Sequence, residues 1–192
     1  MRIYTGIFIV FLIILTGCSE KSSLELISSK VDIRDDRAGE IGVTSGEMKG
    51  EHVKIISLSY DFVLNNNGTK TIGGTEKFNN ETYSYDDGIK LIIEPNQNLI
   101  DVIEEIIGFN IFNEEGRERA YLGFGKSGPS ILEPTQEGEY TFDFDLGAIK
   151  EIPDMRTAPT QEQLDEINKN AKEVTLAIYA EEEEIARFDL SK

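Results

Sequence analysis

The chain of 192 residues has one cysteine, one histidine and no tryptophan. A single cysteine excludes a disulfide within the chain, so we expect the fold to depend on its apolar core. The only histidine is His52, and no Gly-x-Ser-x-Gly or Ser-x-x-Lys motif occurs. The sequence therefore gives no support for catalysis by a serine nucleophile of either type. We expect no catalytic residues, no cofactor and no enzymatic activity.

Basic residues are also scarce. Lysine and arginine number 19, whereas aspartate and glutamate number 36, which gives a formal net charge of −17. A surface of this kind repels nucleic acid and anionic lipid headgroups, and it attracts cations or basic partners loosely. We therefore expect no nucleic-acid partner.

No hydrophobic run is long enough to cross a membrane as a helix. The apolar stretch at residues 3–15 is interrupted by Thr5 and Gly6 and follows a short segment that contains Arg2. Its length is about half of the 20 or so residues that a spanning helix needs. This pattern is typical of the hydrophobic region of a signal peptide.

The segment Leu15-Thr16-Gly17-Cys18 ends this stretch, and residues 19–23 are polar. It resembles the lipobox of bacterial lipoproteins. The resemblance implies that the thiol of Cys18 receives a diacylglyceryl group, that residues 1–17 are removed and that the new N-terminus is acylated. The protein would then be anchored to the cell membrane, on its extracytoplasmic face, through lipid on Cys18. The alternative is a cysteine buried in an uncleaved helix.

The remaining 175 residues (192 less 17) suit one domain with a tether. We predict a signal peptide over residues 1–17, a lipidated Cys18 and polar tether over 18–50, and a β-sandwich domain over 51–192. Residues 24–27 and 31–33 form a candidate strand within the tether region.

Alternation of apolar and polar residues predicts the strands of the domain. The first runs from Val53 to Leu64, and Asn65 to Gly68 predicts a tight hairpin turn into a short strand over 69–72. Hairpin connections are predicted at 114–116 and 181–184. Further strands are predicted over 89–94, 109–113, 117–124, 140–146, 174–180 and 185–190.

Two helices interrupt the strands. Residues 98–107 carry apolar side chains at helical spacing, with Asn98 as a candidate N-cap and Gly108 as a terminator. A second helix begins after Pro159, where Thr160 and Gln163 have the spacing of a capping box. Short strands with two brief helices in connections predict a mainly β fold, an antiparallel immunoglobulin-like β-sandwich.

The segment from Gln136 to Phe142 resembles the tyrosine corner of immunoglobulin-like domains, with Tyr140 as the tyrosine and Phe142 in place of the core cysteine. The missing tryptophan excludes a true antibody-type domain. More broadly, the chain is similar to the uncharacterised lipoproteins of Bacillus-type bacteria, a resemblance that assigns no catalytic residue.

Two segments are candidates for chemistry. Residues 120–127 match a loose P-loop pattern, but Gly128-Pro129 follows where a P-loop requires a helix, so we predict a glycine-rich hairpin or loop. Asp143 and Asp145 share one face of a predicted strand. Because calcium needs six to eight converging oxygens, we interpret this face as solvated and predict no metal site.

These patterns favour a membrane-anchored binding or interaction module at the cell envelope, with an envelope protein as a partner of unknown identity. The alternative is a lipoprotein that binds a cation or a small solute. An enzyme is the third hypothesis and the least supported.

Overall fold

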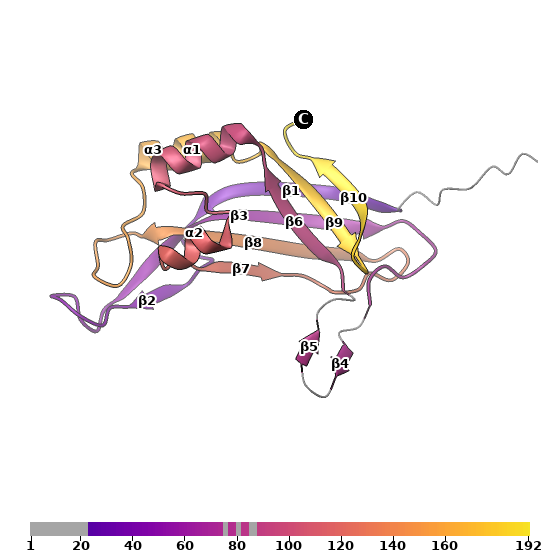
Figure 1. Ribbon diagram of the computed structural model, residues 1–192, viewed down its shortest axis with the longest axis horizontal. Helices are drawn as coiled ribbons and strands as arrows, with labels where there is room; N and C mark the ends of the chain where they lie inside the picture. The colour runs from indigo at the N-terminus through magenta and orange to yellow at the C-terminus, as the bar shows by residue number, and fades with distance from the viewer. Residues whose placement is uncertain (1–22, 75–76, 80–81, 85–87) are drawn as a thin grey trace, which may run out of the picture.

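The computed structural model describes residues 23–74, 77–79, 82–84 and 88–192. Within these residues, two antiparallel sheets pack face to face, and two helices close one end of the space between them (Figure 1). A separate short hairpin joins β4 (Lys77–Asn79) to β5 (Thr82–Ser84). The predicted mainly β sandwich is therefore confirmed.

The larger sheet contains the long strands of the chain. Its order is β1 (Leu24–Arg34), β3 (His52–Asn66), β8 (Glu137–Ala148) and β7 (Phe124–Ser127), with β2 (Glu40–Gly42) paired to the start of β3. The smaller sheet has the order β10 (Glu183–Asp189), β9 (Val174–Ala180) and β6 (Lys90–Pro95). Every pairing within these two sheets is antiparallel.

The order of the strands follows a known pattern. When the short strands β2, β4 and β5 are set aside, the larger sheet holds the first, second, fifth and fourth of seven strands. The smaller sheet holds the seventh, sixth and third. Constant-type immunoglobulin domains divide their strands between two sheets in this way.

The tyrosine-corner prediction is wrong. Tyr140 lies in β8, the fifth of the seven strands, whereas a tyrosine corner belongs to the sixth. Its buried hydroxyl has no hydrogen-bond partner among the described residues. Close packing explains why position 138, two residues before Tyr140, is a glycine. A Cβ on Gly138 would lie 2.7 Å from a methyl group of Leu132 and 2.8 Å from Pro129.

The core lies on the inner face of β3 and β8, as the alternation predicts. Leu58, Tyr60, Phe62 and Leu64 of β3 are almost completely buried. The ring of Phe62 lies edge-on to Phe142, with centroids 6.1 Å apart. Residues of β6, β9 and the helices pack on these rings; they include Leu91, Ile93, Leu99, Ile103, Leu164, Ile167, Leu176 and Ile178.

Both predicted helices form and lie side by side at one end of the sandwich (Figure 1). Asn96, not Asn98, caps α1 (Gln97–Ile107), because its Oδ1 accepts the Leu99 N–H at 3.0 Å. Gly108 ends α1 with a φ of 93°. The capping box of Thr160 and Gln163 starts α3 (Gln161–Asn170), as predicted. The hydroxyl of Tyr60 donates to the Ala171 carbonyl at the end of α3, at 2.9 Å.

The predictions for residues 109–124 are wrong. Residues 114–119 form a third helix, α2 (Glu114–Arg119), in place of a turn and the start of a strand, and residues 109–113 form no strand. The side chain of Asn113 caps α2, and two glutamates follow in its first turn. These are ordinary helix-start signals. They were hidden by a hydrophobic pattern that suits short strands equally well.

The predicted hairpin after β3 is wrong too. Gly68 lacks a positive φ, and only Ile72 of residues 69–72 forms a bridge, to Leu132. The amide of Asn66 explains this path, because its Nδ2 donates to the carbonyls of Lys70 (2.8 Å) and Leu132 (2.9 Å). The chain therefore turns away from β3 toward residue 132.

The candidate strand before residue 51 exists as β1. Residues Leu24 to Arg34 pair with Asn66 to Ser57 of β3, with one register shift. The larger sheet therefore includes two strands, β1 and β2, from the region predicted as tether.

Candidate functional site

The outer face of the larger sheet carries polar side chains in register across three strands. Ser57 pairs with Asp145 and Ser59 with Asp143 across β3 and β8, while Arg34 of β1 pairs with Ser57. The Ser59 hydroxyl donates to Asp143 at 2.6 Å, and the Ser57 hydroxyl donates to Asp145 at 3.1 Å. We call Arg34, Ser57, Ser59, Asp61, Asp143 and Asp145 the polar ladder.

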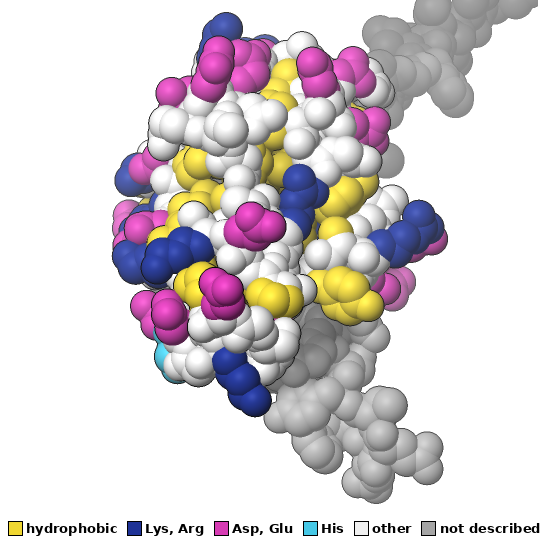
Figure 2. All heavy atoms as spheres, turned by 90° about the vertical axis from the view of Figure 1, so that its left-hand side faces the viewer, with side chains coloured by type: hydrophobic (Ala, Val, Ile, Leu, Met, Phe, Trp, Pro, Cys, Tyr) yellow, Lys and Arg dark blue, Asp and Glu magenta, His cyan; other side chains and the backbone are white. Residues whose placement is uncertain are grey.

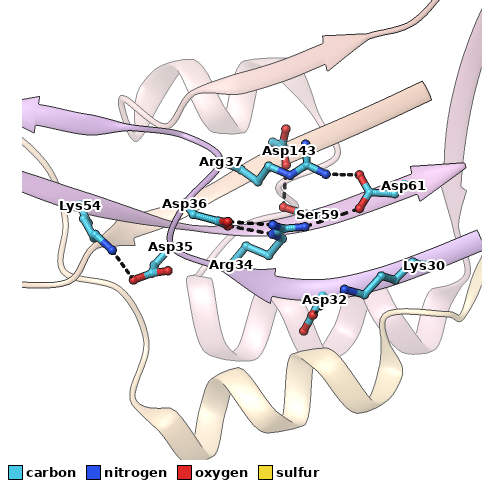
Figure 3. Close-up of polar contacts among 10 residues, drawn as sticks. All are labelled: Lys30, Asp32, Arg34, Asp35, Asp36, Arg37, Lys54, Ser59, Asp61 and Asp143. Atoms are coloured by element: carbon cyan, nitrogen blue, oxygen red, sulfur yellow. Dashed lines mark hydrogen bonds and ion pairs between the residues drawn. The ribbon is translucent and has the colours of Figure 1, made fainter. Parts of the chain in front are cut away.

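Arginine side chains at the end of β1 lie against this ladder (Figure 3). The guanidinium of Arg34 binds both carboxylate oxygens of Asp36 at 2.8 Å and lies 3.7 Å from Asp61. Arg37, in the bend that follows β1, reaches back to Asp61 at 2.5 Å. The bend is thus held to the sheet by ion pairs.

These ion pairs shift the ionisation of their members. The hydrogen bonds from Arg34 lower the pKa of Asp36 to about 2, and Asp36 in turn raises the pKa of Arg34. Both groups stay charged at neutral pH. Because Asp36 and Asp61 already neutralise the two arginines, this corner offers little net charge to a ligand.

Asp145 is the buried carboxylate of the polar ladder. Its side chain is 7% exposed and accepts hydrogen bonds from Ser57 and from the backbone N–H of Gly123 at 3.1 Å. Burial raises the pKa of Asp145, whereas these two hydrogen bonds lower it. The predicted placement of Asp143 and Asp145 on one outer face is correct. A solvated environment is wrong for Asp145, because Gly123 covers it.

A groove of about 570 Å³ runs between β1 and α3. Basic and acidic side chains line it together with two apolar residues of the sheet, and among them are Lys30, Asp32, Arg34, Asp36, Ile33 and Ile56. Gln161, Asp165 and Asn168 line it from α3. The mixed lining suits a polar solute rather than an apolar one.

Of the other sequence candidates in the described chain, only the P-loop-like segment touches the polar ladder, through Gly123 and Asp145. His52 is exposed at the first position of β3. The end of the P-loop-like segment forms β7, which pairs antiparallel with β8, so no helix follows to bind a phosphate. Glu181 and Glu182 form the turn of the β9–β10 hairpin, as predicted, with φ values of 51° and 70°. Cys18 lies outside the described residues.

In the part of the chain that the structure describes, histidine, cysteine and carboxylate side chains form no group of three or more that could hold a metal. None of its helices combines the length and the hydrophobicity needed to cross a bilayer.

Comparisons with known proteins gave no relatives: no family model, no curated protein and no solved structure matches the chain.

The sequence pattern identified Asp143 and Asp145 of the polar ladder but not its other members, nor Arg37, which pairs with Asp61. The serines are visible as the polar half of the alternating strand. Their partners are not, because Ser57 and Asp145 are 88 positions apart and meet only through the register of β3 and β8.

Proposed function

We propose that the chain is a bacterial lipoprotein, anchored to the extracytoplasmic face of the cell membrane through Cys18, whose immunoglobulin-like sandwich is a binding module of the cell envelope. The observation that carries this proposal is the segment Leu15-Thr16-Gly17-Cys18 at the end of the apolar stretch. The strand order, shared with constant-type immunoglobulin domains, supports the kind of domain.

The geometry of the sandwich supports the binding role. The described chain starts at residue 23, at one end of β1, and the opposite end of the sandwich would face away from an anchored N-terminus (Figure 1). Figure 2 views that opposite end, where hydrophobic side chains lie in separate patches between acidic and basic ones. A mixed surface is compatible with protein contacts that form and dissociate, because such interfaces are about as apolar as protein surfaces in general.

Replacement of the lipobox cysteine tests the anchor. In cells fed a labelled fatty acid, Cys18→Ala should abolish both lipid labelling and removal of residues 1–17, and the variant should lose its membrane retention through lipid. Ser19→Ala is the matched control, which should be labelled and processed as the wild type is. A Cys18→Ala protein that is still cleaved and still labelled would contradict the proposal.

The second candidate function is the binding of a cation or small solute. The observation in its favour is the groove between β1 and α3, with its lining of mixed charge. Any solute that binds only the folded protein raises the unfolding midpoint as its concentration grows. Thermal unfolding in millimolar calcium, and then with EDTA, tests the cation. A midpoint that rises with calcium and falls again with EDTA would favour this candidate over a protein partner.

A further inference from the structure

The strand β7 leaves one edge of the larger sheet open. All four of its residues are exposed, and it pairs with β8 alone among the described strands. The Asp145 N–H donates to the Gly123 carbonyl at 3.1 Å. By the alternation of an antiparallel ladder, the backbone N–H and C=O groups of Phe124 and Lys126 then point away from β8. Among the described residues none bonds to these groups, so they are available to another strand.

This edge is less protected by charge than the outer strand of the smaller sheet. Four of the seven residues of β10 are charged, whereas Lys126 is the only charged residue among the four of β7. Charged side chains are the common means by which proteins discourage pairing at a strand edge. The sequence thus blocks the edge of β10 more thoroughly than that of β7.

An exposed tyrosine stands beside this edge at an unfavourable backbone position. Tyr121 directly follows the C-cap of α2 and has a φ of 53°, where glycine is the usual residue. Its side chain is 81% exposed, the highest value among the exposed large hydrophobic residues of the described chain. Glycine there would avoid the strain, and the ring gains no burial in exchange. The tyrosine therefore has no evident role in folding.

Two contacts fix the segment from Tyr121 to β7 in place. The guanidinium of Arg117 in α2 lies 4.7 Å from the centroid of the Phe124 ring and donates to the Ile111 carbonyl at 2.7 Å. Asp145 holds the Gly123 N–H, and a Cβ on Gly123 would lie only 2.5 Å from the Asp145 carboxylate. The open edge and its aromatic neighbours are thus preformed, which lowers the entropy cost of binding.

The charges around the edge are mixed, with more acidic than basic side chains; the basic ones include Arg119 of α2, which pairs with Glu115, and Lys126 of β7. Glu114, Glu115 and Glu118 are exposed on α2, and Asp143 lies opposite Gly125 on the outer face. Because Gly125 has no side chain, β7 does not cover the Asp143 carboxylate on the outer face. A Cβ on Gly125 would lie 3.9 Å from that carboxylate. On the other face of the strand, Phe124 offers apolar surface and is 40% exposed.

We propose that β7 is the docking site for an extended segment of a partner protein in which basic and apolar residues alternate. The segment adds to the larger sheet as a new edge strand, with its backbone bonded to Phe124 and Lys126. Its basic side chains face Asp143, its apolar side chains face Phe124, and the Tyr121 ring contacts a cation of the segment. This site deepens the binding role proposed above by naming the partner's chemistry.

Two synthetic peptides of opposite charge test the proposal. Each has about eight residues, enough for one strand, with lysine and valine alternating in one and glutamate and valine in the other. They are added to the full isotope-labelled chain in detergent micelles, and backbone amide shifts are followed by NMR. We expect the lysine peptide to bind at least about tenfold more tightly. The largest shifts should fall on Phe124 and Lys126.

Two variants and one control sharpen this test. Tyr121→Gly should stabilise the fold by removing the strained φ, yet weaken peptide binding about three- to tenfold. Lys126→Pro removes an outward N–H and should abolish the shifts on β7. Ile149→Ala, at an exposed hydrophobic residue outside β7, should leave the affinity unchanged.

Several results would overturn the proposal. They are equal affinity for the two peptides, shifts centred on the acidic turn at residues 181–184, and unchanged affinity in Tyr121→Gly. Self-association of the free chain that Lys126→Pro abolishes would assign β7 to a second copy instead. The anchor is tested separately, because Cys18→Ala should leave peptide binding unchanged. A wild-type protein that binds the peptide but carries no lipid would contradict only the anchor.

Discussion

The two faces of β3 and β8 are built from the same strands and differ in almost every other respect. The inner face carries aromatic rings and aliphatic side chains in contact, such as Tyr60 with Phe144 at 6.2 Å between ring centroids. The outer face carries serines and carboxylates joined by hydrogen bonds. Burial is nevertheless deep on both, since Ser57 and Ser59 are as inaccessible as the core residues. Burial alone therefore does not define the core.

The difference lies in what each side chain requires. An apolar ring is stabilised by any close-packed neighbour, whereas a buried hydroxyl or carboxylate needs a partner in a specific place. We therefore expect substitutions on the inner face to lower the stability by the volume they remove. Substitutions on the outer face should lower it by the hydrogen bonds they remove.

The largest effect should come from the inner face. Phe142→Ala removes a ring that is 5% exposed and contacts Phe62 and Phe124. We expect a loss of about 3–5 kcal/mol in the free energy of unfolding, the usual cost of truncating a large core residue. Denaturant unfolding measures it. A loss below about 1 kcal/mol would show that the inner face tolerates the cavity, and it would contradict the expectation that lost volume decides stability there.

Asp145 tests the outer face through pH. Burial raises its pKa, so the folded state holds this proton more tightly than the unfolded state does. Its contribution to stability is then most favourable below the unfolded-state pKa and is lost as the pH rises through the folded-state pKa. Asp145→Asn cannot titrate, so its stability relative to the wild type should increase over that range.

At neutral pH, the two oxygens of the Asp145 carboxylate accept hydrogen bonds from the Ser57 hydroxyl and the Gly123 N–H. The amide in Asp145→Asn has only one oxygen to accept both. We expect a net loss of about 1–3 kcal/mol, the cost of leaving a buried polar group without a partner. Unfolding of both proteins across a pH series gives the two quantities together. Parallel pH profiles would show that Asp145 does not titrate as its burial implies.

Two tyrosines on the inner face form a matched pair. The Tyr60 hydroxyl donates to the Ala171 carbonyl, whereas the Tyr140 hydroxyl has no partner among the described residues. Tyr60→Phe should therefore cost about 1 kcal/mol, the value of one buried hydrogen bond. Tyr140→Phe should be neutral or stabilising. Equal losses in the two variants, measured by denaturant unfolding, would mean that the hydroxyl of Tyr140 is satisfied in solution.

The smallest effect should come from the ion pairs at the rim of the polar ladder. Arg37→Ala removes the contact with Asp61, in which both side chains are about 30% exposed (30% and 29%). Such pairs contribute at most about 1 kcal/mol and are screened by salt. We expect a small loss at low ionic strength that disappears at about 1 M salt. A loss that persists in high salt would point to packing rather than charge.

Much of the fold could be predicted from local patterns. The alternation in residues 53–64 and 140–146 identified the inner face, and the range 174–180 predicted for β9 is correct at both ends. Thr160 and Gln163 identified the start of α3. These patterns are reliable because they follow from the covalent geometry of strands and helices, whose side chains repeat every two or 3.6 residues.

Other elements could not be predicted in that way. The hairpin expected at Asn65 to Gly68 fails because the Asn66 side chain binds carbonyls at residues 70 and 132. The helix α2 depends on a cap at Asn113 in a segment whose hydrophobic pattern also suits a strand. Local propensity leaves such segments undecided, and contacts with the rest of the chain select one state.

By itself, then, the sequence determined the acidic charge, the candidate lipid anchor at Cys18 and the inner faces of the long strands. The tertiary structure decided which polar groups meet: Ser57 with Asp145, Arg37 with Asp61, and Gly123 with Asp145. It also decided that β7 lies at an open edge. The reason is that a side-chain period is a local property, whereas strand order and register arise from pairings between segments that are distant in the chain.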